Sequence, residues 1–369
     1  MNDTASSNKK TYFEFMRIFA CGLVIFNHLP GYLLYMTASE GKQYIYMCLA
    51  MITKVNVPLF FMISGALLLG KDEKWTETFR KRFGRVLFLL LVFSFVLYSV
   101  VKIKNTISGV EYEYTFYKFI YGFLNNQMEG VMEILAYWYL YSYLGFLFCL
   151  PMLQRIARGF NRTEFYAILI LHFVTASLLP LINVYLNMKG LPALTITGRF
   201  SVPLSAERAF FYPLIGYYLD NRVDINKVKM KHLLSLGAAA AAGIMLSNMC
   251  TYYDADVNGA YSQNYVMLFD YIISIAVFVI IKYTFIVAFP DFLNTGRIKR
   301  MICFAGSLTL GIYLLDPCLK IIMYNRYEMW AEQYLPTLLV SIGWILVSMV
   351  CGGLLTCILK KFPLMRKVL

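Results

Sequence analysis

The feature of this sequence that most restricts its fold is a succession of long apolar segments joined by short polar connections. A helix of about 20 apolar residues is long enough to cross the hydrocarbon core of a bilayer, and a helix satisfies its own backbone hydrogen bonds there. We therefore expect an all-α integral membrane protein with about ten transmembrane helices around a central cavity. The predicted spans are residues 12–34, 44–70, 86–104, 131–152, 164–183, 205–220, 233–253, 265–289, 301–324 and 335–359.

Composition supports this assignment and excludes other classes. Of 369 residues, 59% are hydrophobic and 15% are charged, whereas soluble domains carry about 25% charged residues. The net charge of +13 alone would suggest a nucleic-acid partner. The cations stand in short loops between apolar segments, however, so membrane topology and anionic lipid explain them and no nucleic acid is expected. The three histidines and eight cysteines are scattered without ligand spacing, so we expect no metal site.

The distribution of Lys and Arg predicts the orientation. If the N-terminus is cytoplasmic, the connections on that side hold 22 Lys or Arg and the opposite connections hold 7. Because cytoplasmic loops are the cation-rich ones, both termini are predicted to be cytoplasmic. We expect one transmembrane domain over residues 1–369, with a flexible N-terminus at 1–10 and a basic cytoplasmic tail at 360–369.

The first predicted span contains Glu14, Arg17 and His28. A charged group in hydrocarbon costs at least a few kcal/mol, so such groups usually face a protein interior or a wet cavity. Eleven residues separate Arg17 from His28, which is about three helical turns, so a continuous helix would place both on nearly the same face. We expect His28 and Arg17 to be the catalytic residues. His28 is the stronger candidate, because a neutral imidazole can take a proton from a hydroxyl and return it to a leaving group. The alternative is a buried histidine bonded to a neighbouring helix, which is the expected role of His172.

The arginines have two interpretations each. Arg17 could bind an anion that enters from the cytoplasm, or it could pair with Glu14 one turn away, and the two do not exclude each other. Arg82 and Arg85 stand three residues apart where the third span begins. Arginine forks suit phosphate oxygens, whereas the alternative is ordinary cytoplasmic positive charge.

Other polar residues in the spans are weaker candidates. Ser64 could donate a hydrogen bond to a ligand, but a serine nucleophile would need a base that spacing does not reveal. Glu207 and Arg208 could form a local ion pair. Asp316 and Pro317 are predicted to break the ninth helix and to approach the cavity, where a relay role competes with a structural salt bridge.

A set of motifs in chain order resembles the membrane-bound acyltransferase family 3, which acylates sugars and related acceptors. The first span carries the Arg-x10-His arrangement of Arg17 and His28, and the basic loop carries Arg-x-x-Arg. Two departures are Ala66, where the family usually has a bulkier residue, and Asp316, where many members have histidine. The matching segments are 55–70 (VNVPLFFMISGALLLG), 82–85 (RFGR), 138–151 (WYLYSYLGFLFCLP), 212–219 (YPLIGYYL) and 307–317 (SLTLGIYLLDP).

The resemblance implies an acyl-CoA donor, usually acetyl-CoA, which enters from the cytoplasm. Arg82 and Arg85 would meet its phosphates, with Arg17 and Ser64 further along the donor path. His28 would act as general base or carry the acyl group briefly. The acceptor would be a carbohydrate or a lipid-linked glycan at the outer face of a bacterial plasma membrane.

Two rival functions remain open from the sequence. Broken helices and charges within spans also suit an exporter of a polysaccharide or lipid-linked glycan without acyl transfer. The departures at Ala66 and Asp316 would suit a sensor or scaffold that has lost the chemistry.

Overall fold

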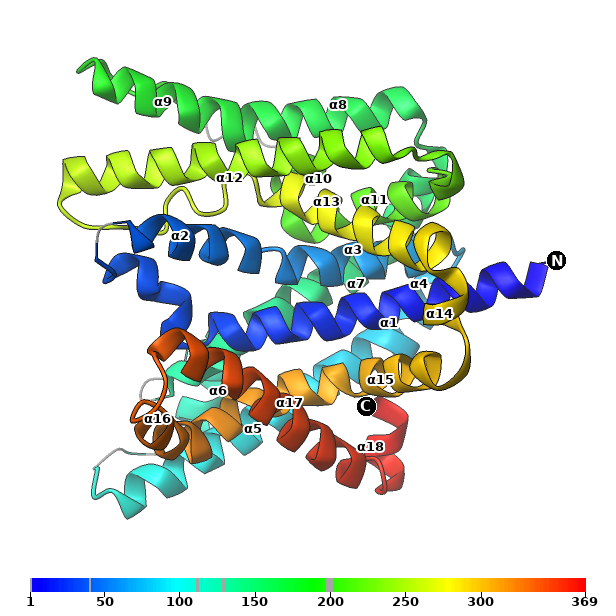
Figure 1. The fold of residues 1–369 in the computed structure, drawn as a ribbon. Coiled ribbons are helices and arrows are strands. Elements are labelled where there is room, and N and C mark those ends of the chain that lie inside the picture. The colour runs from blue at the N-terminus through cyan, green and yellow to red at the C-terminus, as the bar shows by residue number, and fades with distance from the viewer. Residues whose placement is uncertain (1, 40, 111–112, 114, 128–130, 197–201) are drawn as a thin grey trace. The chain divides into compact units, whose positions relative to one another are not determined.

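The structure is a computed structural model that describes residues 2–39, 41–110, 113, 115–127, 131–196 and 202–369. In these residues the chain is helical and contains no strand (Figure 1). The predicted all-α class is therefore confirmed. The chain forms two compact units, each described by itself below. The first comprises residues 1–23, 32–72 and 152–303, and the second comprises residues 24–31, 73–151 and 304–369.

Eight helices in the described part are long and apolar enough to cross a membrane. A bent pair, Thr11–Asn27 and Pro30–Met36, would be a ninth span if its two parts cross together. The helix Arg208–Asn221 has 14 residues and is about 20 Å long, which is short for a full crossing. The count of about ten spans and the cytoplasmic termini therefore stay predictions. The eight helices are Lys42–Leu68, Trp75–Ile107, Ile134–Gly159, Arg162–Met188, Met230–Asn258, Asp270–Ala288, Gly296–Ala331 and Thr337–Leu359.

The elements of the first unit begin with most of α1 (Asn2–Asn27), whose end lies in the second unit. They continue with η1 (Pro30–Met36), which is shared in the same way, α2 (Lys42–Thr53), α3 (Asn56–Leu68), α8 (Arg162–Phe173), η4 (Val174–Leu178), α9 (Leu179–Met188), α10 (Pro203–Ala206), α11 (Arg208–Asn221), η5 (Ile225–Lys227), α12 (Met230–Asn258), α13 (Asp270–Tyr283), η6 (Thr284–Ala288) and α14 (Pro290–Asn294).

The second unit contains most of the basic segment that is predicted to face the cytoplasm, together with the last helices of the chain. Its elements are α4 (Trp75–Thr78), η2 (Phe79–Phe83), α5 (Gly84–Ile107), α6 (Phe116–Asn125), η3 (Met132–Tyr137), most of α7 (Trp138–Gly159), most of α15 (Gly296–Leu319), η7 (Lys320–Tyr324), α16 (Asn325–Ala331), α17 (Thr337–Leu359) and α18 (Pro363–Val368).

In the first unit, α3 and α11 cross with backbone against backbone. A Cβ atom built on Gly65 would lie 1.9 Å from the Pro213 carbonyl oxygen, and one on Gly216 would lie 2.0 Å from the Met62 carbonyl oxygen. Only glycine leaves room for this approach, which is the usual role of small residues between membrane helices. The crossing explains why the Ser64–Gly65 pair interrupts an otherwise bulky apolar segment.

In the second unit, the helix α15 does not end at Asp316 and Pro317 as expected. It continues to Leu319 with Pro317 in its interior, and the wider helical turn of η7 follows. Proline removes one backbone donor, and neighbouring groups can satisfy the carbonyls that this leaves. The Tyr137 hydroxyl donates to the Leu314 carbonyl at 2.6 Å, within the turn that the proline disturbs. The prediction of a helix break there is wrong.

The first span also differs from its prediction. Helix α1 ends at Asn27, and the backbone N–H groups of His28 and Leu29 bond back only three residues, at 3.1 Å each. The next segment begins at Pro30 and is bent by 62° from α1. Pro30 lacks a donor and disfavours helical geometry in the residue before it. His28 therefore lies in the turn that follows α1. The expected continuous helix over residues 12–34 is wrong, and the placement of His28 on the Arg17 face stays a prediction.

Candidate functional site

The turn after α1 places His28 against a buried carboxylate in the second unit. His28 Nδ1 lies 2.8 Å from Asp316 Oδ2 on α15. The other carboxylate oxygen, Oδ1, accepts a hydrogen bond from the Ser348 hydroxyl on α17 at 2.8 Å. The Asp316 side chain is 1% exposed, whereas the His28 side chain is 22% exposed. The acid is therefore sealed and satisfied, and the imidazole keeps an accessible edge.

The partner of Nδ1 determines what the other ring nitrogen can do. An ionised carboxylate only accepts hydrogen bonds, so the neutral imidazole carries its proton on Nδ1 and directs it to Asp316. Nε2 then holds a lone pair and can accept a proton. A carboxylate in this position also stabilises the imidazolium that forms after proton transfer. His28 and Asp316 thus have the arrangement of a general base and its orienting acid.

Further contacts fix the backbone of the His28 turn. Lys320 Nζ on η7 donates to the His28 carbonyl oxygen at 2.5 Å. The Gly31 backbone N–H donates to Ser341 Oγ on α17 at 3.1 Å, and a Cβ atom on Gly31 would lie 2.3 Å from that oxygen. The turn is therefore held from η7 and α17 as well as through its imidazole.

Arg17 belongs to the first unit and pairs with Glu14 one turn earlier on α1. Its side chain is 31% exposed, so part of the guanidinium remains accessible. The predicted local pair is confirmed, and anion binding by Arg17 stays a prediction.

The arginines of the basic segment lie in the second unit with different partners. Arg82 makes a two-pronged contact with Glu73, with Nε at 2.9 Å and Nη2 at 2.6 Å from its two carboxylate oxygens. Arg85 Nε donates to the Val368 carbonyl oxygen at 2.7 Å near the C-terminus. Charge-assisted forked contacts are strong, so a phosphate at Arg82 would have to replace Glu73. The sequence did not reveal this competition, because the two residues stand nine positions apart.

Ser64 lies on α3 in the first unit, and its hydroxyl donates to the Phe60 carbonyl of its own helix at 2.9 Å. This is a common way for a serine to be satisfied within a helix. The contact supports the structural interpretation of Ser64, and ligand binding by it stays a prediction.

Comparison with known families decides the class of the protein. A family model for an acyltransferase domain matches residues 10–359. The chain belongs to the acyltransferase 3 family. It is therefore a membrane acyltransferase, with an acyl donor and an acceptor as its substrates. Neither a curated protein nor a solved structure matches the chain.

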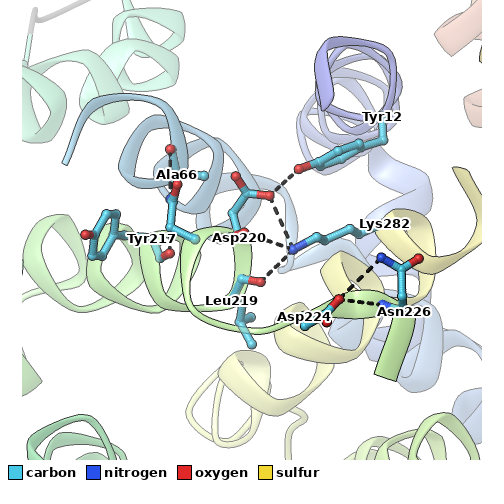
Figure 2. Close-up of polar contacts among 9 residues, drawn as sticks. Tyr12, Ala66, Tyr217, Leu219, Asp220, Asp224, Asn226 and Lys282 are labelled. Atoms are coloured by element: carbon cyan, nitrogen blue, oxygen red, sulfur yellow. Dashed lines mark hydrogen bonds and ion pairs between the residues drawn. The ribbon is translucent and has the colours of Figure 1, made fainter. Parts of the chain in front are cut away.

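The acyltransferase also contains a buried polar cluster that sequence reasoning missed (Figure 2). The Tyr12 hydroxyl donates to Asp220 Oδ1, and Lys282 Nζ lies 3.4 Å from the same oxygen. Lys282 also donates to the Leu219 carbonyl at 2.8 Å and to the Asp220 carbonyl at 3.2 Å. Each charge has a partner of opposite sign, so the cluster joins α1, α11 and α13 within the first unit and is a structural feature. Lysine and aspartate within apolar segments were its only sequence signal.

Other polar residues of this acyltransferase have partners within the chain. His172 is buried, its Nδ1 lies 2.8 Å from the Ser205 carbonyl oxygen, and its ring stacks on Phe211 at 3.8 Å. Its predicted role as a structural histidine is confirmed. Arg208 pairs with Asp270 at 3.1 Å instead of with Glu207. Within the described ranges, no three His, Cys, Asp or Glu side chains lie together as metal ligands.

Proposed function

We propose that this acyltransferase transfers an acyl group, by preference acetyl, from cytoplasmic acyl-CoA to a hydroxyl of a cell-surface or lipid-linked carbohydrate. The site of action would be a bacterial plasma membrane. The observation that carries the proposal is the contact of His28 with the buried carboxylate of Asp316, which leaves Nε2 available as a base.

The reaction needs one proton to move twice. His28 Nε2 takes the proton of the acceptor hydroxyl while the oxygen attacks the thioester carbonyl. The carbon–sulfur bond breaks, and the imidazolium returns the proton to the leaving sulfur, which gives free CoA thiol and the ester. Asp316 stabilises the imidazolium between these steps. The same nitrogen could instead carry the acyl group as a short-lived intermediate, which would use Nε2 as nucleophile.

In this proposal, arginine side chains bind the acyl-CoA donor. Arg82 and Arg85 would contact the phosphates of acyl-CoA, with Arg82 exchanging Glu73 for phosphate oxygens. The two carboxylate oxygens of Glu73 accept from the Nε and Nη2 groups of Arg82, and two phosphate oxygens could accept from the same pair of donors. Arg17 would bind the donor further along its path, and Ser64 would contribute a hydroxyl if it leaves its helical carbonyl.

The contrast between two histidines supports His28 as the reactive one. His172 has one nitrogen on a carbonyl and one face against Phe211, and it is 8% exposed as a residue. These contacts and this burial are typical of a histidine with a structural role. The His28 side chain combines a sealed acid on one nitrogen with 22% exposure, which suits a group that receives protons from a substrate.

The test measures label transfer from acetyl-CoA to surface glycans. Membranes from cells that express wild type, His28→Ala or His232→Gln would receive labelled acetyl-CoA, and glycans would be analysed by mass. His232 is an exposed histidine at the start of α12 and serves as the matched control. We expect His28→Ala to lose about 100-fold or more of the activity, because general-base catalysis contributes about 10²–10⁴-fold. Full activity in His28→Ala would remove the mechanism, and glycan export without release of CoA thiol would support the exporter instead.

A further inference from the structure

The first unit contains three charged side chains that the proposed reaction does not use. Lys54 lies between α2 and α3, Arg208 is the first residue of α11, and Asp270 is the first residue of α13. These helices pack against one another within the unit. Lys54 stands inside a candidate membrane span, where charge is costly and usually functional, and Asp270 is the first residue of another.

Asp270 is matched by one of the two cations. Arg208 Nη2 lies 3.1 Å from Asp270 Oδ2, and the Asp270 side chain is 3% exposed. The buried Tyr212 hydroxyl also bonds to this carboxylate. The Arg208 side chain is 35% exposed, and its Nη2 also donates to the Met267 sulfur at 3.2 Å. One positive and one negative charge thus balance, and part of the guanidinium remains accessible.

Lys54 is the surplus cation. Its ammonium lies 4.5 Å from the centroid of the Tyr32 ring, and the charged groups that act on it are Arg208 and Asp270. In the described part of the chain it makes no hydrogen bond and no ion pair within 4 Å. An ammonium has three donors, and an aromatic face satisfies none of them as an oxygen would. The cluster therefore carries one uncompensated positive charge and unused donors.

The titratable groups that the structure describes near this cluster do not supply the missing negative charge. Glu207 precedes Arg208 but is exposed, and the contacts of Lys54 and Arg208 do not include it. His172, which lies close enough for Arg208 to act on it, is held on a backbone carbonyl. Among the residues that the structure describes, Asp270 is balanced by Arg208 and no other acid contacts Lys54, so a bound anion would supply the compensation.

The helices indicate the side from which this anion would come. Lys54 and Arg208 are each about 20 Å, at 1.5 Å per residue, from the ends of α3 and α11 at Leu68 and Asn221. In the predicted orientation those ends face the cytoplasm. The cluster then lies in the outer half of the membrane, on the side where a carbohydrate acceptor would arrive.

We propose that Lys54 and Arg208 form a binding site for an oxyanion, a carboxylate or a phosphate, carried by the acceptor. The acceptor would accordingly be an anionic glycan or a phosphate-linked one, and a neutral glycan would bind poorly. The assignment of the anion to an acceptor rests on the proposed function, whereas the anion site itself does not.

The experiment measures binding without any acyl donor. The purified full-length protein in lipid nanodiscs would be titrated with trigalacturonic acid as the carboxylate probe and glucose 1-phosphate as the phosphate probe. Fully methyl-esterified trigalacturonic acid is the neutral control. Lys54→Met is the main variant, because it breaks no ion pair and leaves Arg208 on Asp270. Lys54→Arg keeps the charge, and Lys189→Met is the matched control, since Lys189 also lies over a tyrosine ring, at 5.9 Å from the Tyr185 centroid.

We expect an anionic probe to bind and the methyl ester not to bind. Lys54→Met should raise the dissociation constant of that probe by about 10- to 100-fold, as expected for a hydrogen bond to a charged group. The dissociation constant for Lys54→Arg should stay within about threefold of wild type, because a positive charge remains at position 54. The constant for Lys189→Met should do the same, because this substitution leaves the cluster unchanged. The probe that binds distinguishes a carboxylate from a phosphate. Absence of binding by both anionic probes, equal binding of the methyl ester, or wild-type binding by folded Lys54→Met would overturn the proposal.

The outcome is separable from that of the proposed function. His28→Ala should bind the anionic probe as wild type does. If probes bind but no acyl transfer occurs, the acyl-transfer chemistry fails and the anion site stands. If acyl transfer is found with neutral acceptors and no probe binds, the anion site fails and the chemistry stands.

Discussion

Replacement of Asp316 by asparagine tests the core of the proposed catalytic arrangement. The substitution keeps the volume of a side chain that is 1% exposed, so it should disturb packing little. It removes the negative charge 2.8 Å from His28 Nδ1. The Asp316 Oδ1 atom also accepts from Ser348, so an asparagine oxygen that keeps this bond would turn its amide N–H₂ toward His28. The imidazole would then carry its proton on Nε2 and could no longer accept one there.

The expected loss follows from two contributions. A hydrogen bond to a charged partner contributes about 1.5–3 kcal/mol and a neutral one about 0.5–1.5 kcal/mol, so loss of the charge alone costs about 1–1.5 kcal/mol, or about tenfold in rate. The wrong tautomer adds to this, and loss of the carboxylate in a Ser-His-Asp triad costs about 10⁴-fold. We expect kcat to fall by about 10²–10³-fold, with the KM for acetyl-CoA changed by less than about threefold.

The assay measures the transfer of labelled acetyl groups from acetyl-CoA in membranes. The size-exclusion elution profile of each purified variant, compared with that of wild type, checks its folding. Ser348→Ala is the graded control, because it removes one hydrogen bond from Asp316 but keeps the carboxylate on His28. It should cost about tenfold, which corresponds to the lower end of the about 1.5–3 kcal/mol expected for a hydrogen bond to a charged group. A folded Asp316→Asn enzyme with the wild-type kcat would refute the role of the acid, and equal losses in both variants would indicate a general disturbance of packing.

Two further substitutions test the crossing of α3 with α11 and the donor path. Gly65→Ala should lower the melting temperature of the purified protein, because its Cβ would meet the Pro213 carbonyl and overpacking costs about 1–3 kcal/mol; Gly145→Ala, with no atom within 4 Å, should not lower it. Equal melting temperatures for the two variants would contradict the close crossing. Glu73→Gln should lower the KM for acetyl-CoA by about three- to tenfold, because it weakens the competitor for the Arg82 fork. An unchanged KM would indicate that this pair only anchors its loop.

The long apolar helices were predictable, because hydropathy alone indicates them. Apolar segments such as 233–253 and 335–359 became helices with ends displaced by up to five residues. The first span was less predictable at its end, because helical periodicity assumes an unbroken helix. Pro30 ended α1 at Asn27, and its effect on the preceding turn outweighed the apolar character of the residues beyond it.

The candidate site was half predictable. The sequence indicated His28, because histidine is rare in this chain and stands in an apolar segment. Its partner Asp316 was noticed as an acid within a span, but the two residues are 288 positions apart and no spacing rule connects them. The expected break at Pro317 was wrong for a related reason, since the Tyr137 hydroxyl that supports that turn comes from another part of the chain. Partners of this kind depend on tertiary packing.

The burial of Asp316 itself argues for a role beyond packing. A carboxylate taken out of water carries a penalty of several kcal/mol, and apolar residues of similar volume often stabilise a core at least as well as a buried pair does. Within the described residues the acid does not pair with a permanent cation, although Lys320 reaches the same turn through the His28 carbonyl. It pairs with a side chain whose charge depends on an added proton. That pairing gives little stability while the imidazole is neutral, and it strengthens when His28 becomes protonated. In the proposed reaction, His28 becomes protonated when the acceptor hydroxyl loses its proton.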